Sequence, residues 1–331
     1  MGARLPVRGD YQLVHSANRI PYTTKPWIVT FESFLPRTLG SGAEGFKKLL
    51  RKRLVKDNCK KIIAISDYAR NRFVLENADW PMLGRALEKL QTIHPNVPLA
   101  ASEPKTLLVG EPLRLVFVGN DFARKGGIVA LRLAEKAGRE GLPVTVHIVS
   151  ALNYGPGVYT DCTDASRYEE DLKLLDLPNV VFHGVKSNRE VLQLLSQSHF
   201  QVMATLDDTY GFSVIEGFSV GTPAITTNVC ALPEFVHPEK NGYLLSMDLN
   251  QGRNWTNLGL RGTSGYWDVL DETFDDLAEQ ALRTLRGILA EPERYETLSA
   301  NSLTRVRDFH DADKIGRMLD DIYSATLQPA T

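Results

Sequence analysis

The stretch DTYGFSVIEGFSVGTPAITTNVCALPE, residues 208–234, gathers acidic side chains around a turn of small residues. Asp208 and Glu216 stand eight residues apart, and Glu234 follows near the end. Between them, a Gly-Thr-Pro turn leads into an apolar run over 224–226, which predicts a strand. A plain structural segment needs no such ordered chemistry, so the stretch predicts a ligand-binding part of an α/β fold.

Strand and helix patterns alternate through the part of the chain that surrounds this stretch. Strands are predicted over 113–119, 144–150, 180–183, 200–204 and 224–226, and helices over 128–141, 167–175, 187–196 and 212–220. Such alternation indicates a parallel sheet with helices on both faces. Residues 248–268 break the rhythm and are interpreted as a surface insertion, and further helices are predicted over 270–289, 293–309 and 312–326.

The first third of the chain predicts a second, smaller α/β domain. Short apolar runs predict strands over 11–16, 27–31, 61–66 and 93–97. A segment rich in Pro, Ala and Ser, centred near residue 103, predicts the linker between domains. The expected domains are therefore 1–103 and 104–311, with a C-terminal helix over 312–328 packing back on the first domain.

The bulk composition is that of a globular protein. Of the 331 residues, 43% are hydrophobic and 24% charged, and the net charge of −2 gives no overall attraction to nucleic acid. The cysteines, Cys59, Cys162 and Cys230, are odd in number and lack zinc-type spacing, which favours a reducing compartment. The N-terminus does not resemble a signal peptide, and no apolar run reaches the roughly 18 residues that span a bilayer. We expect a cytoplasmic protein.

A basic helix is predicted over 46–61. Its apolar positions are Phe46, Leu49, Leu50, Leu54 and Val55, and its basic positions are Lys47, Lys48, Arg51, Lys52, Arg53 and Lys56. One interpretation is a solvated surface helix that packs on the sheet. The other is a patch that docks on anionic lipid, which would make the protein peripheral on the inner face of a membrane.

The loop after strand 113–119 carries two adjacent cations, Arg124 and Lys125, just before a helix. Backbone N–H groups at a helix N-terminus favour anions, and cations strengthen that preference. The loop matches neither a Walker motif nor a GxGxxG fingerprint. The alternative is an ordinary turn with incidental surface charges.

Taken together, these features predict a site for a nucleotide sugar. Arg124 and Lys125 suit a diphosphate, and Glu216 suits the hydroxyls of a ribose, as acidic residues do in dinucleotide folds. Asp208, on its loop, suits the hydroxyls of a sugar. Taken singly, Glu216 could instead complement the dipole of its helix.

The second domain resembles the donor-binding half of retaining glycosyltransferases of family 4, which have the GT-B fold. The segments that carry the likeness are 117–127, 179–195, the D-x7-E passage at 208–216, 220–236 and 237–245, with a thinner likeness at 61–74 and 93–97. The resemblance implies an α/β protein with two Rossmann-like domains facing a cleft, the first one reduced.

The implied activity is that of a retaining hexosyltransferase. It would move a hexosyl group from a nucleotide-diphosphate sugar to a sugar or lipid-linked acceptor, with no metal and no cofactor besides the donor. The resemblance assigns catalytic roles to Arg124, Lys125, Asp208 and Glu216. It assigns donor binding to Gly119, Asn120, His183, Gly184, Val185, Tyr210, Gly211, Phe212 and Ser213.

Two departures from the family stand out. Asp208 occupies the place of a glutamate and is one methylene shorter, and part of the usual first domain is missing. By position, His15 and Glu32 are the acceptor-side candidates, although His15 also suits a core or turn role. The short first domain leaves open an alternative function, a catalytically weak nucleotide-sugar-binding subunit of a glycosylation assembly. A nucleotide-sugar epimerase ranks last.

Overall fold

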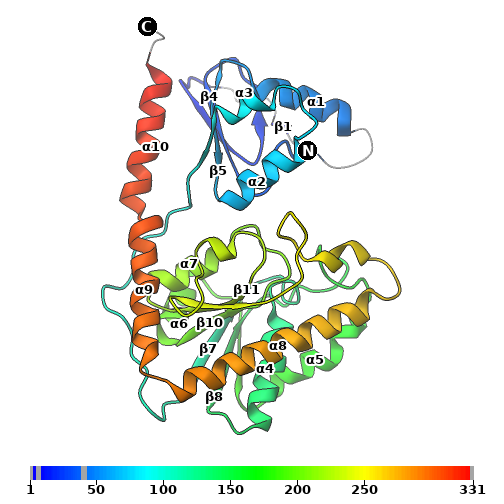
Figure 1. The fold of residues 1–331 in the computed structure, drawn as a ribbon, viewed down its shortest axis with the longest axis vertical. Coiled ribbons are helices and arrows are strands. Elements are labelled where there is room, and N and C mark those ends of the chain that lie inside the picture. The colour runs from blue at the N-terminus through cyan, green and yellow to red at the C-terminus, as the bar shows by residue number, and fades with distance from the viewer. Residues whose placement is uncertain (1–2, 5–8, 39–42, 329–331) are drawn as a thin grey trace. The chain divides into compact units, whose positions relative to one another are not determined.

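The computed structural model describes residues 3–4, 9–38 and 43–328, in two compact units (Figure 1). Unit 1 comprises Met1–Asn96 and His310–Thr331, and unit 2 comprises Val97–Phe309. The segment that follows Val97 lies along unit 2, where the N–H of Ala100 donates to the carbonyl of Ser219 at 2.9 Å. For that reason the division at residue 96/97 precedes the boundary of 103/104 expected from composition. Residues 1–2 and 5–8, on which the expectation about a signal peptide largely rests, lie outside the described residues.

Unit 2 contains a six-stranded parallel sheet in the order β12-β11-β10-β7-β8-β9. Its strands are β7 (Leu113–Val118), β8 (Val144–Val149), β9 (Val180–Gly184), β10 (Phe200–Met203), β11 (Ala224–Thr227) and β12 (Gly242–Leu245). Chain order runs outward from β7 to β9 on one side and from β10 to β12 on the other. The strand order therefore reverses between β7 and β10, which is the topology of a Rossmann sheet.

Helices cover both faces of this sheet (Figure 1). They are α4 (Gly127–Arg139), α5 (Glu169–Lys173), α6 (Asn188–Gln197), α7 (Phe212–Ser219), α8 (Tyr266–Ala290) and α9 (Arg294–Phe309). Val116 and Val149 pack with Val191, Leu195 and Val220 in one buried cluster, which fixes α6 on its face of the sheet. Helices α4 and α8 pack against each other, and α4 also contacts β8.

The structure corrects several details of unit 2. The predicted helix 167–175 is divided into η1 (Ala165–Tyr168), α5 and η2 (Leu174–Asp176), and β12 is a strand that was not predicted. The stretch 248–268 is not purely a surface insertion. Trp255 and Tyr266 are buried, and Tyr266 already begins α8. Large aromatic side chains within a polar stretch anchor it to the domain.

The strands in the described part of unit 1 form a four-stranded parallel sheet, β2-β4-β5-β6, and a small pair, β1-β3. They are β1 (Ala3–Arg4), β2 (Val14–Ala17), β3 (Ile20–Pro21), β4 (Trp27–Phe31), β5 (Cys59–Ala64) and β6 (Leu90–Thr92); the helices are α1 (Ala43–Leu54), α2 (Asp67–Glu76), α3 (Leu83–Leu87) and α10 (Ala312–Leu327). On one sheet face, Trp27 and Phe31 pack with Leu50 of α1 and Phe73 of α2.

The other face of the unit 1 sheet is covered by the C-terminal helix. Ile28, Ile63 and Ile93 pack with Ile315 of α10, and further apolar residues of that helix join the cluster. Because consecutive residues of a strand point to opposite faces, a strand with apolar residues on both faces must be covered twice. The second cover comes from the far end of the chain.

Two predictions about unit 1 are wrong. The helix predicted over 46–61 ends at Leu54, because Cys59–Ala64 is drawn into the sheet as β5. The strand predicted over 93–97 is displaced to Leu90–Thr92. The N–H of Ile93 still donates to the carbonyl of Ala64. The hydrogen-bond ladder stops soon after, because Pro95 has no N–H. Among the described residues, no helix combines the length and apolarity needed to cross a membrane.

Candidate functional site

The reversal of strand order in unit 2 brings two loops together. One follows β7 and runs over 119–126, and the other follows β10 and runs over 204–211. In open α/β sheets, ligands bind beyond the carboxyl ends of the strands at such a reversal. Arg124, Lys125 and Asp208 lie on these two loops, so the fold brings them together from distant parts of the sequence.

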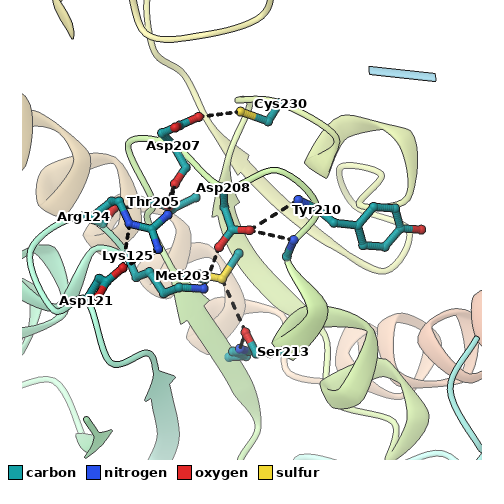
Figure 2. Close-up of polar contacts among 12 residues, drawn as sticks. Asp121, Arg124, Lys125, Met203, Thr205, Asp207, Asp208, Tyr210, Ser213 and Cys230 are labelled. Atoms are coloured by element: carbon teal, nitrogen blue, oxygen red, sulfur yellow. Dashed lines mark hydrogen bonds and ion pairs between the residues drawn. The ribbon is translucent and has the colours of Figure 1, made fainter. Parts of the chain in front are cut away.

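Lys125 and Asp208 bridge the two loops directly. The Nζ of Lys125 lies 2.7 Å from Oδ2 of Asp208 (Figure 2). The other carboxylate oxygen accepts the N–H groups of Tyr210, at 3.3 Å, and Gly211, at 3.0 Å. Asp208 is only 8% exposed. Burial raises its pKa, but the charge and hydrogen bond of Lys125, together with the charge of Arg124 and the N–H of Tyr210, outweigh burial and hold the pKa below its usual value.

Arg124 makes a second bridge. Its Nη1 donates to the carbonyl of Asp207 at 2.6 Å, while Nε and Nη2 donate to Oδ2 of Asp121 at 3.1 and 2.7 Å (Figure 2). The hydroxyl of Thr205 lies 3.0 Å from the carbonyl of Arg124. The guanidinium thus serves as a tie between the loops, a role that sequence analysis did not assign to it.

Glycines allow these loops to approach closely. Gly126 has a φ of 90°, and a Cβ there would lie 2.5 Å from the carbonyl oxygen of Ala204. Gly211 has a φ of 89° and stands at the N-cap of α7. The lack of a side chain at Gly119 leaves room for the side chain of Lys125, since a Cβ at Gly119 would lie 2.7 Å from Cδ of Lys125. The positive φ angles of Gly126 and Gly211 therefore favour glycine at this edge of the sheet, and the backbone contact at Gly126 requires it.

Glu216 lies in α7 and is half-buried. Its Oε1 accepts a hydrogen bond from Nδ2 of Asn188, the first residue of α6, at 3.0 Å. Burial raises the pKa of Glu216, although the bond from Asn188 and the charge of Lys125 oppose that shift. Asn188 was not predicted as a site residue, because its approach to Glu216 depends on how two helices pack.

The remaining donor-side candidates differ in how much of each residue is exposed to solvent. Gly184 ends β9, the edge strand beside β8, and Nε2 of the adjacent His183 lies 2.9 Å from Nδ1 of His147; Val185 is exposed. Asn120 is exposed, and its carbonyl accepts the N–H of Asn153.

The candidates on and after the loop between β10 and α7 include both buried and exposed side chains. The Tyr210 side chain is fully buried and stacks on Phe235, with ring centroids 5.1 Å apart, so it forms core structure. Phe212 is 47% exposed. The Ser213 hydroxyl accepts from the Gln201 amide at 2.9 Å and lies 3.4 Å from the Met203 sulfur.

The acceptor-side candidates lie in unit 1 and contact their own unit. The ring nitrogens of His15 form hydrogen bonds with the hydroxyls of Tyr323 and Thr30, both at 2.7 Å. Burial lowers the pKa of His15. A carboxylate oxygen of Glu32 lies 3.5 Å from the guanidinium of Arg37. His15 thus links β2, β4 and α10 of this unit.

A group of residues that sequence analysis missed supports the loop after β10. Oδ1 of Asp207 accepts from the Cys230 thiol at 3.1 Å and from Nδ2 of Asn254 at 3.2 Å. Arg253 pairs with Glu234 at 3.3 Å, which gives the third acid of the opening stretch a structural partner. Cys230 has a φ of 51°, unusual for a residue other than glycine. The stretch that broke the strand–helix rhythm therefore braces the site.

Comparison with known proteins agrees with this geometry. Residues 100–251 match the family model described as glycosyl transferases group 1. No curated protein matches the sequence. Among residues 3–4, 9–38 and 43–328, no three His, Cys, Asp or Glu side chains are grouped so that they could hold a metal ion.

Solved structures, a glycosyltransferase among them, share the fold over more than 90% of the chain. A glycosyltransferase from Rickettsia africae has a TM-score of 0.66 at 16% identity, covering 96% of this chain and 78% of its own. Sucrose-phosphate synthase from Thermosynechococcus elongatus has a TM-score of 0.62 at 18% identity, with coverages of 95% and 73%. The Anabaena protein HepE, in complex with UDP, has a TM-score of 0.63 at 16% identity, with coverages of 91% and 72%.

The family match falls on the unit whose two loops form the candidate site, and the structural likeness extends to both parallel sheets. The α/β fold is the GT-B fold expected from the sequence. Residues 100–251 match the glycosyl transferases group 1 family, and the chain is a transferase enzyme with the GT-B fold.

Proposed function

We propose that the chain is a retaining glycosyltransferase of family 4 that moves a hexosyl group from a nucleotide-diphosphate sugar to a sugar or lipid-linked acceptor. The observation that carries this proposal is the Lys125–Asp208 bridge at the reversal of strand order. It supplies a cation that is held in place by a buried carboxylate, where the fold favours a bound nucleotide.

Uridine diphosphate is the donor nucleotide that the comparisons favour. HepE has been solved with UDP, with UDP and glucose, and with UDP-glucose, and a pneumococcal O-GlcNAc transferase with UDP and GlcNAc. These ligands belong to those proteins. For this chain we propose a UDP-sugar on the basis of the shared fold.

In the proposed reaction, the bond between the anomeric carbon and the diphosphate oxygen breaks as the acceptor oxygen attacks from the same face. The acceptor proton passes to the departing phosphate oxygen. Lys125 stabilises the negative charge that develops on the diphosphate, without a metal ion or a cofactor besides the donor. Arg124 contributes to the same field while it holds the two loops together.

We propose that the carboxylates have binding and positioning roles. Glu216 accepts the hydroxyls of the ribose, in the orientation set by its bond from Asn188. Asp208 orients Lys125 and the start of α7, and its short side chain is engaged there. The half-buried His183 and Gly184 and the exposed Val185 border the nucleobase. The backbone of Phe212 and Ser213 faces the sugar or phosphate, because the N–H of Gly211 is engaged by Asp208.

Isothermal titration with UDP tests the phosphate assignment. Lys125→Ala should weaken UDP binding about tenfold or more, because a hydrogen bond to a charged group contributes about 1.5–3 kcal/mol. Lys173→Ala, which removes an exposed lysine that pairs with Glu170, is the matched control and should bind as the parent does. Equal affinity in the Lys125→Ala variant would remove the basis of the proposal.

A turnover assay distinguishes an active glycosyltransferase from the alternative, a subunit that binds nucleotide sugar but is catalytically weak. Release of UDP from a panel of UDP-sugars is measured with sugar and lipid-linked acceptors, and the anomeric configuration of the product is assigned by nuclear magnetic resonance. An inverted product contradicts the retaining mechanism. Binding of UDP without any turnover favours the subunit.

A further inference from the structure

Two histidines of unit 2 form a pair that the proposed reaction does not use. Nδ1 of His147, in β8, lies 2.9 Å from Nε2 of His183, in β9. The rings are stacked, with centroids 5.2 Å apart and an angle of 16° between their planes. A hydrogen bond between two ring nitrogens needs an N–H on one ring and a bare nitrogen on the other. The accepting ring must therefore be neutral.

The surroundings of both rings favour the neutral form. Burial lowers the pKa of His147, and His183 and Arg114 act in the same direction. Burial also lowers the pKa of His183, and Lys186 adds to that shift. At neutral pH the pair is therefore uncharged and its hydrogen bond is intact.

The pair lies at an irregularity in the sheet. Ile148 and Val149, which are consecutive in β8, pair with Phe182 and Gly184, so His183 is an extra residue in β9. Such a bulge interrupts the ladder of hydrogen bonds between two strands. Among the strands that the structure describes, β9 is held by β8 alone, because it lies at the edge of the sheet. The histidine pair therefore joins the two strands where their ladder is interrupted.

The bulge leads directly into the turn that joins β9 to α6. Gly184, which follows His183, has a φ of 66°, and its carbonyl accepts the N–H of Ser150 at 3.1 Å. At the end of the turn stands Asn188, which donates to Glu216, the residue proposed to bind the ribose. A base attached to that ribose would meet the backbone of this turn.

We propose that His147 is a positioning residue for the nucleobase. Through its hydrogen bond to His183 it fixes the bulge at the end of β9, and with it the turn of Gly184 and Val185 that borders the base. The inference rests on the proposed function, because it requires a nucleotide at this site. Without the bond, the turn has to be ordered when the nucleotide binds, which weakens affinity. Other residues hold the ribose and the phosphates, so the contribution of the base alone should change.

Isothermal titration with UDP and with ribose 5-diphosphate, which lacks the uracil, tests this inference. The dissociation constant of ribose 5-diphosphate divided by that of UDP gives the contribution of the base. His147→Phe keeps an aromatic ring in β8 but removes the hydrogen bond, and it should reduce this ratio about threefold to tenfold. The affinity for ribose 5-diphosphate should stay unchanged.

Further variants separate positioning from a general loss of structure. The amide of an asparagine stands close to the place of Nδ1 and can donate or accept, so His147→Asn should restore most of the ratio. His183→Phe should show the same loss as His147→Phe, and the double variant should lose no more than either. Thr145→Val, two residues before His147 on the same face of β8, is the control and should bind both ligands as the parent does. Thermal unfolding checks that each variant is folded.

The outcomes distinguish this inference from the proposed function. An unchanged ratio in His147→Phe, or equal losses of affinity for UDP and for ribose 5-diphosphate, would overturn the inference. So would a parent that binds UDP no more tightly than ribose 5-diphosphate, which leaves the phosphate assignment intact. A parent that binds neither ligand contradicts the proposed function itself.

Discussion

Asp208 shows why a shorter acid suits this position. Its carboxylate accepts the N–H groups of Tyr210 and Gly211, two and three residues further along the chain. Aspartate is well suited to such local turns because its short side chain reaches its own backbone. The same carboxylate holds Lys125. The departure from the family pattern is thus matched by a set of contacts in which the side chain is fully engaged.

Replacing Asp208 by Asn should make stability less dependent on pH. The folded-state pKa of Asp208 is lowered, so its charged form contributes stability above the ordinary value of about 3.9, and this contribution is lost as the pH falls through the folded pKa. We expect Asp208→Asn to lower the free energy of unfolding by about 1–3 kcal/mol at pH 7. The difference from the parent should shrink toward pH 2.

Chemical denaturation at pH 7, 4 and 2 measures this difference. Asp321→Asn, at an exposed position of α10, is the control and should differ little from the parent at any pH. A deficit in Asp208→Asn that stays constant across this pH range would show that charge is not what Asp208 contributes.

The residue types at the site could be predicted from the sequence, but their partners could not. Lys125 and Asp208 were each selected as candidates, yet the ion pair between them depends on the adjacency of β7 and β10. Arg124 was expected to bind the donor diphosphate, which stays a prediction; that three of its donors are also engaged by Asp121 and Asp207 could not be predicted. Long-range pairing leaves no local pattern to detect.

At the scale of elements, buried strands were the most predictable part of the fold. Trp27–Phe31 was predicted at its observed bounds, since a short apolar run that is buried on both faces has a clear composition. The end of α1 was misjudged because Cys59–Ala64 continues the same mixture of lysines and apolar residues. The spacing of apolar residues does not show where α1 ends and β5 begins. The boundary is set by the pairing of β5 with β4.

The start of α4 is set by a glycine that no other residue can replace. Gly126→Ala should lower the free energy of unfolding by about 3 kcal/mol or more, because its φ is 90° and the added Cβ would lie 2.5 Å from the backbone of Ala204. Gly138→Ala, in the same helix, meets only ordinary contacts and should raise stability by about 0.5–1 kcal/mol.

Denaturant unfolding of the two variants measures both effects on one element. The opposite signs are the essential outcome, since both changes add one methyl group, one at the N-cap of α4 and one within the helix. If both variants lost the same stability, the close approach of the two site loops would not be what requires Gly126.

At the scale of the whole molecule, the polypeptide begins and ends in the same unit. Unit 2 is continuous and contains residues 100–251, which match the glycosyl transferases group 1 family, whereas unit 1 is assembled from two separate segments of the chain. The apolar spacing of the C-terminal helix could be read from the sequence. Its contact with Ile28, Ile63 and Ile93 could not, because nothing local specifies which sheet a distant helix covers.

Ile315→Ala should destabilise unit 1 by about 2–4 kcal/mol, since Ile315 is buried against the three isoleucines of the sheet. Leu327→Ala, at an exposed position of the same helix, should change stability by less than about 0.5 kcal/mol. Fluorescence of Trp27 and Trp80, which both lie in the core of unit 1, reports its unfolding. Equal effects of the two substitutions would mean that α10 does not complete this core.

The divided unit has a consequence for how the protein is made. Synthesis at about 5–20 residues per second leaves tens of seconds between the emergence of Ile93 and that of Ile315. During this time unit 2 can fold as a continuous piece, while one face of the unit 1 sheet waits for its cover. The unit that leaves the ribosome first is therefore the last to be finished, and its three isoleucines are the surface that a chaperone would meet on the nascent chain.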